Sequence, residues 1–129
     1  MIKINLTGIY VTDQDRALDF YTNVLRFRKK FDVPYGDARW LTVVSPAEPD
    51  GVQLVLEPGG SKIAREYQHA MLDAGIPVQS FATDDLHAEY ERMRDLGVQF
   101  IMEPTREGPV TYTVFDDTCG NLIALHQED

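Results

Sequence analysis

The chain consists of two similar halves, and this internal repeat limits the possible folds more than any other feature. "INLTGIYV" has the β-branched and aromatic composition of a strand, and "DQDRALDFYTNVL" follows it with apolar residues at helical spacing. "RWLTVVSP" and "GVQLVLEP" predict two more strands around the turn sequence "SPAEPDG". The second half predicts a strand in "PVQSFATDD", a helix in "DLHAEYERMRDLGV" and a hairpin in "VTYTVFDDTCGNLIALHQ".

The two halves also correspond by position. Adding 71 to the number of Asp13 gives Asp84, and adding 69 to the number of Gly51 gives Gly120. A repeat of about 60 residues that contains a strand, a helix and further strands is typical of a duplicated module rather than of a solenoid. The repeat therefore predicts an α+β fold made of two tandem modules.

A further helix is predicted between the two halves, at about residues 61–75. The Gly59–Gly60 pair precedes it, and Gly75 is placed to end it. An apolar stripe at helical spacing predicts that this linker helix packs on the body of the protein; the stripe contains Ile63, Tyr67, Ala70, Met71 and Ala74. The expected organisation is one domain of residues 1–129, with module one at about 1–58 and module two at about 76–127.

The charge balance argues against several classes of partner. The chain has 12 Lys and Arg and 21 Asp and Glu, so that its net charge is −9. No basic stripe is available to neutralise phosphates, which argues against nucleic acid and against anionic membrane surfaces. An acidic surface mildly favours neutral or cationic ligands.

Cysteine content and hydropathy suggest a cytoplasmic protein. Cys119 is the single cysteine, so neither an internal disulfide nor a thiolate zinc cluster can form. The opening "MIKINLTGIYV" is too interrupted by polar residues for the apolar core of a signal peptide, and no apolar stretch approaches the length of a membrane span.

Two motifs resemble those of the vicinal oxygen chelate superfamily, the group of glyoxalase I, bleomycin-resistance proteins and extradiol dioxygenases. "VTDQDRALDFYTNVL" is similar to the entry segment of that family, and "FDDTCGNLIAL" is similar to its exit hairpin. One departure is Arg26, at a position where the family usually has the glycine that closes the first helix. The resemblance implies two tandem βαβββ modules that form a cupped mixed sheet. It also implies a cleft that holds either a divalent metal or an organic ligand.

The usual metal ligands of the family are not present in this sequence. The four ligand positions that the resemblance implies fall on apolar residues, namely Leu6, Val55, Val78 and Ala124. Alkyl side chains cannot coordinate a cation, so we expect no metal cofactor. A register shift of two residues would instead place Glu57 and His126 at two of the positions, and this pair is the alternative site for one divalent ion.

Polar and aromatic residues on the predicted cleft strands are the candidate ligand-binding residues: Tyr10, Trp40, Gln53, Glu57, Ser80 and His126. A mostly apolar pocket with a few polar anchors is typical of small-molecule sites. Two alternatives stay open. Trp40 could be a core residue rather than a pocket wall, and His126 could be a solvated residue at a strand end.

The sequence therefore predicts a protein that binds a small organic molecule in its cleft without metal. The first alternative is a metal-dependent lyase, isomerase or dioxygenase that uses Glu57 and His126, and the second is metal-free general acid–base catalysis by either residue. The resemblance also implies a homodimer. Neither the ligand nor whether the protein is catalytic follows from the sequence, because a fold does not fix a function.

Overall fold

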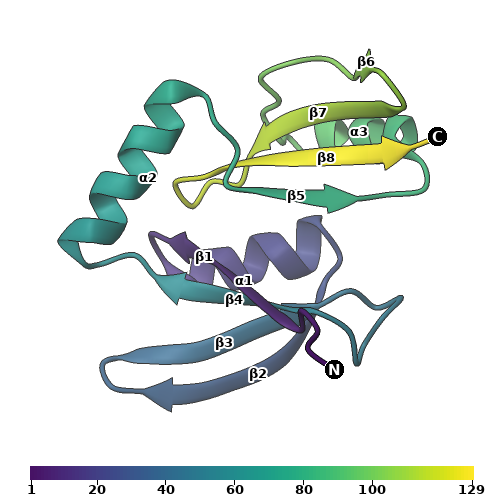
Figure 1. The fold of residues 1–129 in the computed structure, drawn as a ribbon. Coiled ribbons are helices and arrows are strands. Elements are labelled where there is room, and N and C mark those ends of the chain that lie inside the picture. The colour runs from purple at the N-terminus through teal and green to yellow at the C-terminus, as the bar shows by residue number, and fades with distance from the viewer. The chain divides into compact units, whose positions relative to one another are not determined.

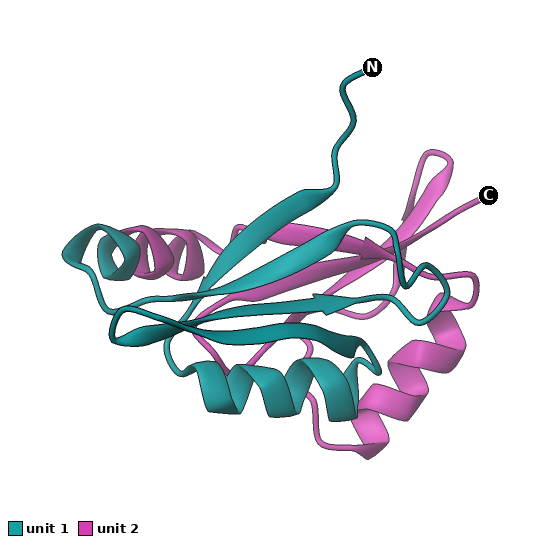
Figure 2. Ribbon diagram, turned by 90° about the horizontal axis from the view of Figure 1, so that it is seen from below, with its two compact units in different colours: residues 1–66 teal, residues 67–129 magenta.

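A computed structural model describes all 129 residues of the chain. The chain forms two compact units, unit 1 from Met1 to Glu66 and unit 2 from Tyr67 to Asp129, which Figure 2 shows in different colours. Each unit is built around its own four-stranded mixed sheet (Figure 1). None of the helices combines the length and the apolar composition that a membrane span requires.

Unit 1 has the element order strand, helix and three strands. Its elements are β1 (Leu6–Val11), α1 (Gln14–Asp19), the π-helical turn η1 (Phe20–Val24), β2 (Arg28–Tyr35), β3 (Ala38–Val44) and β4 (Gln53–Pro58). The strand order in the sheet is β1-β4-β3-β2. β1 pairs with β4 in parallel, whereas β3 pairs with both β4 and β2 in antiparallel orientation.

Unit 2 repeats this topology after the linker helix. α2 (Lys62–Ala74) crosses the boundary between the units and leads to β5 (Gln79–Ala82), α3 (Leu86–Asp95), β6 (Thr105–Glu107), β7 (Val110–Asp116) and β8 (Leu122–Glu128). The strand order is β5-β8-β7-β6, again with one parallel pair, β5 with β8. The predicted α+β fold with two tandem βαβββ modules is therefore confirmed. The assignment of residues 1–129 to a single domain stays a prediction.

In each unit a helix covers one face of the sheet, as Figures 1 and 2 show for α1 and α3. Because strand residues alternate between faces, every second residue is buried on the helix side. In unit 1 the buried set is Ile9, Val11, Leu41, Val43, Leu54 and Leu56, together with Ala17, Phe20 and Tyr21 of the helical segment. In unit 2 it is Thr113, Phe115, Ile123 and Leu125, together with Leu86, Tyr90 and Met93 of α3.

The ends of the helices follow the signals in the sequence. Asp13 is the N-cap of α1, since its carboxylate accepts hydrogen bonds from the backbone N–H groups of Asp15 and Arg16. Asp85 caps α3 in the same way, through the N–H of Ala88. Gly97 follows α3 with a φ of 90°, as expected of a glycine that ends a helix.

The prediction for the buried side of α2 was wrong. Ile63 of the predicted apolar stripe is 76% exposed and Tyr67 is also exposed, whereas Ala64 and Gln68 are buried. The reason is that hydrogen bonds, rather than apolar contacts, hold the inward side of α2. The side-chain amide of Gln68 donates to the carbonyl oxygen of Cys119 at 3.1 Å and to Oδ1 of Asn121 at 3.2 Å. These hydrogen bonds set which side of α2 faces inward in unit 2.

Arg26 occupies a left-handed backbone conformation, with a φ of 66°. A non-glycine residue pays roughly 1–2 kcal/mol there, because its Cβ approaches the following carbonyl oxygen. We therefore expect Arg26→Gly to raise the free energy of unfolding by about 0.5–1 kcal/mol. The gain is smaller than the strain that is removed, because glycine also has more conformational entropy in the unfolded chain. Urea denaturation measures the effect. Arg28→Gly, in the extended strand β2, is the control and should destabilise the protein. A loss of stability in Arg26→Gly would contradict the prediction.

Candidate functional site

The face of the unit 1 sheet that carries no helix is the candidate site, and we call it the helix-free face of unit 1. The strand register places Gly8 beside Val55, Tyr10 beside Glu57 and Thr42 beside Val55. Residues that pair across strands point to the same side of a sheet. The helix-free face therefore consists of Leu6, Gly8, Tyr10, Phe31, Val33, Tyr35, Ala38, Trp40, Thr42, Gln53, Val55 and Glu57.

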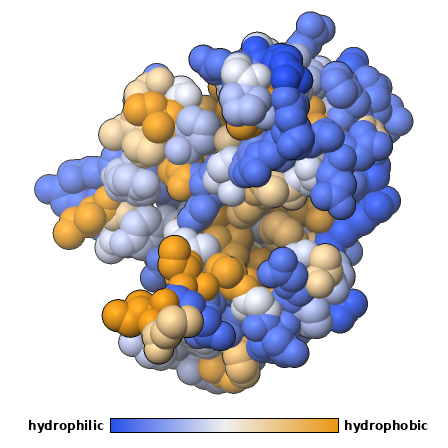
Figure 3. All heavy atoms as spheres, turned by 45° about the vertical axis from the view of Figure 1, so that its right-hand side comes forward, coloured by the Kyte–Doolittle hydropathy of each residue, from blue (hydrophilic) through white to orange (hydrophobic).

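This face is apolar and aromatic although much of it is exposed. Leu6 is 46% exposed, Val33 is 47% exposed and Tyr35 is 71% exposed. The solvent side of a sheet that is packed on one face is ordinarily polar. An exposed apolar surface therefore marks a place where a ligand or another surface binds. Figure 3 shows that hydrophobic side chains gather in patches within a mainly hydrophilic surface.

Strand β2 contributes to this character in a way that its sequence partly conceals. In "RKKFDVPY" every second residue from Phe31 on is apolar, but the charged residues and the proline between and before them make this alternation hard to recognise. Phe31 pairs with Thr42 and Val33 pairs with Trp40, so both point to the helix-free face. Sequence reasoning did not place this strand, although the alternation of Phe31, Val33 and Tyr35 was the available signal.

Glu57 lies over the backbone of Gly8 on the same face. A Cβ atom added at Gly8 would lie 2.8 Å from Oε2 of Glu57, which is closer than carbon–oxygen contact allows. The absence of a side chain at position 8 thus makes room for the carboxylate of Glu57. Tyr10 is the neighbour of Glu57 in the parallel register, which gives the carboxylate an aromatic neighbour.

Gln53 is held in a fixed orientation on this face. The hydroxyl of Thr42 donates to Oε1 of Gln53 at 2.9 Å, and it accepts from the backbone N–H of Phe31 at 3.2 Å. Thr42 at the centre of this chain is fully buried, and both hydrogen bonds are partly buried. A side-chain amide that is oriented in this way is a suitable polar anchor for a ligand.

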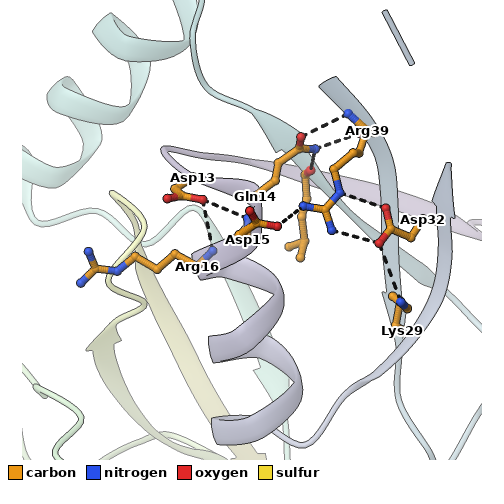
Figure 4. A network of polar contacts seen from close by, with 8 residues as sticks. Asp13, Gln14, Asp15, Arg16, Lys29, Asp32 and Arg39 are labelled. Atoms are coloured by element: carbon orange, nitrogen blue, oxygen red, sulfur yellow. Dashed lines mark hydrogen bonds and ion pairs between the residues drawn. The ribbon is translucent and has the colours of Figure 1, made fainter. Parts of the chain in front are cut away.

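A network on the other side of the sheet positions the strands that carry Trp40 and Glu57 (Figure 4). Nε2 of Gln14 donates to the carbonyl oxygens of Arg39 at 2.8 Å and of Leu56 at 2.9 Å. Its Oε1 accepts from the backbone N–H of Arg39 at 3.2 Å. Gln14 thus joins the start of α1 to the residues that directly precede Trp40 and Glu57.

The side chain of Arg39 extends this network to β2. Its Nε and Nη2 each donate to Asp32 at 2.9 Å, and its Nη1 also pairs with Asp15. Lys29 lies 3.7 Å from the same Asp32 carboxylate. The guanidinium bond from Arg39 holds the pKa of Asp32 below its usual value of 3.8, and the charges of Arg39 and Lys29 act in the same direction.

This lowered pKa predicts a pH-dependent contribution to stability. Because the folded pKa of Asp32 lies below the unfolded one, its stabilising effect is present above about pH 4 and is lost as the pH falls through the lowered pKa. We expect Asp32→Asn to lower the free energy of unfolding by about 0.2–1 kcal/mol at pH 7, since the pair is partly exposed. This difference in the free energy of unfolding between Asp32→Asn and the wild-type protein should be smaller at pH 3. Denaturation at both values tests this, and a deficit that is equal at both would contradict it.

The helix-free face of the unit 2 sheet is smaller and more polar. Oγ of Ser80 and Nδ1 of His126 lie 2.6 Å apart, and Nε2 of His126 lies 3.8 Å from Oε1 of Glu128. Tyr112 is paired with His126 across β7 and β8. The charge of Glu107 and a hydrogen bond with it raise the pKa of Tyr112, so the phenol stays protonated.

The structure brings the six candidate residues onto two surfaces. Tyr10, Trp40, Gln53 and Glu57 share the helix-free face of unit 1, whereas Ser80 and His126 are hydrogen-bonded in unit 2. Their role in ligand binding stays a prediction. Trp40 is half-buried on this face and is not among the buried residues of the core.

The four family ligand positions divide between the units in the same way. Leu6 and Val55 belong to unit 1, and Val78 and Ala124 belong to unit 2. Of the alternative pair, Glu57 belongs to unit 1 and His126 to unit 2. No group of three or more His, Cys, Asp or Glu side chains is arranged to share a metal ion.

Comparison with known proteins identifies the family. An uncharacterised protein of Bacillus subtilis, YurT, is 50% identical over 127 residues, which cover 98% of this chain and 100% of YurT. The crystal structure of UcmS2 has a TM-score of 0.85 at 33% identity and covers 98% of both chains. TnmS3, described as an antibiotic binding protein from Streptomyces sp. CB03234, has a TM-score of 0.77 at 26% identity and covers 100% of this chain and 98% of its own.

The predicted resemblance is confirmed by a family model that matches most of the chain. The match extends over residues 3–125, which include all of the first βαβββ module, the linker helix and the second module as far as the middle of β8. The chain belongs to the Glyoxalase/Bleomycin resistance protein/Dioxygenase superfamily.

Proposed function

We propose that this protein binds a small, planar organic molecule on the helix-free face of unit 1, without a metal ion. The observation that carries the proposal is the exposed apolar and aromatic surface around Trp40, Val33 and Tyr35. Burying that surface against a flat apolar ligand is favourable by about 25 cal/mol per Å² of area removed from water. Gln53 and Glu57 lie on the same face and supply the polar contacts that fix the orientation of a ligand.

Charge favours a neutral or cationic ligand over an anionic one. Glu57 presents a carboxylate next to Tyr10, and the whole chain carries a net charge of −9. A cation near a carboxylate is stabilised directly, and aromatic rings attract cations through their negative faces. An anionic ligand would meet repulsion from the same groups.

The relatives add support of the same kind. TnmS3 shares the fold over nearly its whole length and is an antibiotic binding protein, which makes a small organic ligand a reasonable expectation for this chain as well. A fold alone does not assign a ligand, so the argument depends on the composition of the helix-free face.

The fluorescence of Trp40 provides a direct test, because it is the single tryptophan and lies on the proposed site. The protein is titrated with a panel of planar aromatic compounds that are matched in size and differ in charge. We expect saturable quenching or a wavelength shift with cationic and neutral members, and weaker binding of anionic ones. Val33→Lys should remove the response, whereas Leu96→Lys, an equally drastic change at an exposed position at the end of α3, should not. No saturable response from any class would overturn the proposal.

The metal-dependent alternative requires a separate measurement. The purified protein is incubated with zinc, manganese, nickel and iron(II), exchanged into metal-free buffer and analysed for its elements. We expect no retained ion in stoichiometric amount. About one ion per chain, lost in both Glu57→Ala and His126→Ala, would instead support a divalent-metal lyase, isomerase or dioxygenase.

We also propose that the protein is a cytoplasmic homodimer. Support for association comes from apolar side chains that are exposed along and just after α2, among them Ile63, Leu72 and Ile76. Support for a reducing compartment is that Cys119 is the single cysteine of the sequence, so that the chain forms no internal disulfide; its side chain is buried. Sedimentation at micromolar concentration tests the dimer, and a monomer would exclude it.

A further inference from the structure

We infer that Ser80, His126 and Glu128 form an esterase-like site in unit 2, in which Ser80 is an activated nucleophile. The site is separate from the proposed ligand face of unit 1 in its residues and in its chemistry. Three groups in a row carry the inference: a hydroxyl, an imidazole and a carboxylate. This order is the one that nucleophilic serine catalysis requires.

The hydrogen bond between Ser80 and His126 provides the nucleophile and its base. Oγ of Ser80 lies 2.6 Å from Nδ1 of His126, within the distance over which a base accepts a hydroxyl proton. The pair joins two neighbouring strands, because β5 and β8 run in parallel with Ser80 beside Ala124 and Ala82 beside His126. Both side chains therefore project from hydrogen-bonded strands rather than from loops.

Glu128 is placed where a carboxylate would favour the tautomer that this chemistry needs. Its Oε1 lies 3.8 Å from Nε2 of His126, the ring nitrogen that Ser80 does not contact. A carboxylate on that side favours the proton on Nε2, which leaves the lone pair of Nδ1 for the proton of Ser80. The distance is longer than a hydrogen bond, and such contacts are often looser before a substrate binds.

The surroundings leave space for a substrate. The positions beside the pair in the register are Ala82 and Ala124, whose methyl groups do not cover the hydroxyl, and Ser80 itself is exposed. Val114, which is buried, lies beside Ala124, and the half-buried Tyr112 lies beside His126, so that an aromatic ring is the neighbour of the pair on β7. Because Ser80 is exposed and its strand neighbours are small, we expect a small ester to reach its hydroxyl.

The reaction is balanced without any cofactor. Oγ of Ser80 attacks the ester carbonyl carbon while Nδ1 of His126 takes its proton, and the carbon–oxygen bond to the leaving alcohol breaks as His126 returns the proton to that alcohol. The product is an acyl ester on Ser80. Water then attacks this ester with His126 again as base, and the carboxylic acid and free Ser80 result. The substrate class is an activated carboxylic ester.

The test uses the full chain, p-nitrophenyl acetate and a fluorophosphonate probe, with EDTA present throughout. We expect hydrolysis above the buffer rate, an acetyl group on the peptide that contains Ser80, and fluorophosphonate labelling at the same residue. Ser80→Ala should lose both labels and reduce hydrolysis to the buffer rate. His126→Asn should slow hydrolysis by about 10²-fold or more. Glu128→Gln should slow it at most about fivefold, because Glu128 is 77% exposed.

Controls separate this site from general surface reactivity. His87→Asn removes another exposed histidine and Ser45→Ala another serine, and both should retain the wild-type rate and the label on Ser80. Thermal unfolding of each variant shows whether it is folded, and the two labels on the wild-type protein decide the question even if a variant is not. Hydrolysis at the wild-type rate in folded Ser80→Ala, or labels on residues other than Ser80, would overturn the inference. So would the absence of any label.

Discussion

Replacing Asp117 by alanine is expected to lower the free energy of unfolding by about 3–5 kcal/mol, as typically follows from leaving buried polar groups without partners. Asp117 is fully buried. Its Oδ1 accepts from the backbone N–H groups of Cys119 at 2.7 Å and of Asn121 at 3.1 Å, and its Oδ2 accepts from Nδ2 of Asn121 at 2.9 Å. The substitution leaves these three buried donors without the carboxylate that accepts from them, which is costly.

The neighbouring residue provides a matched control. Asp116 is only half-buried, and its Oδ1 accepts one hydrogen bond, from the backbone N–H of Thr118 at 2.7 Å. Asp116→Ala should therefore cost only about 0.5–1.5 kcal/mol. Urea denaturation followed by circular dichroism measures both variants. Equal losses in the two would mean that burial of the carboxylate does not determine the effect.

The role of Asp117 marks a limit of sequence reasoning. The pair Asp116–Asp117 predicts a turn, and a turn is present between β7 and β8. The turn is also bonded by a distant residue, because the side-chain amide of Gln68 of α2 donates to the carbonyl oxygen of Cys119, 51 residues later. The sequence around a turn carries no information about which distant segment of the chain packs on it. The same contact explains why the apolar stripe of α2 was placed on the wrong side.

The periodic parts of the fold were predictable. The alternation along β1, β4 and β5 gave the correct faces for Tyr10, Gln53 and Ser80. In a strand with a period of two, once one residue is assigned to a face of the sheet, the faces of all the others follow. The repeat gave the tandem modules, and capping residues gave the ends of the helices. β2 was missed because edge strands tolerate charged residues and proline, which resemble loop sequence.

Contacts within the candidate sites were less predictable. That Ser80 and His126 meet depends on the pairing of two strands 46 residues apart, which no local signal specifies. The close approach of Glu57 to Gly8 depends in the same way on the parallel pairing of β1 with β4. Sequence reasoning can thus propose which residues share a face, whereas the register decides which of them touch.

The contact of Glu57 with Gly8 leads to a prediction about ligand charge. Given a cationic aromatic ligand on the helix-free face of unit 1, Glu57→Gln should weaken its binding by about 10- to 100-fold, because a bond to a charged group contributes roughly 1.5–3 kcal/mol. Binding of a neutral ligand of the same shape should change little, since glutamine keeps the size of the side chain. Trp40 fluorescence reports both affinities. Asp95→Asn, at an exposed position on α3, makes the same change in net charge and should leave both affinities unaltered.

Gly8→Ala gives an independent test of the same carboxylate without changing any charge. The new Cβ would lie 2.8 Å from Oε2 of Glu57, so the carboxylate has to move away from its position over β1. If the carboxylate contacts the cation, Gly8→Ala and Glu57→Gln should both weaken the cationic ligand selectively, and the double variant should be no weaker than Glu57→Gln alone. Equal losses for cationic and neutral ligands would show that shape rather than charge governs binding on this face. Additive losses in the double variant would show that Gly8 contributes to binding independently of Glu57.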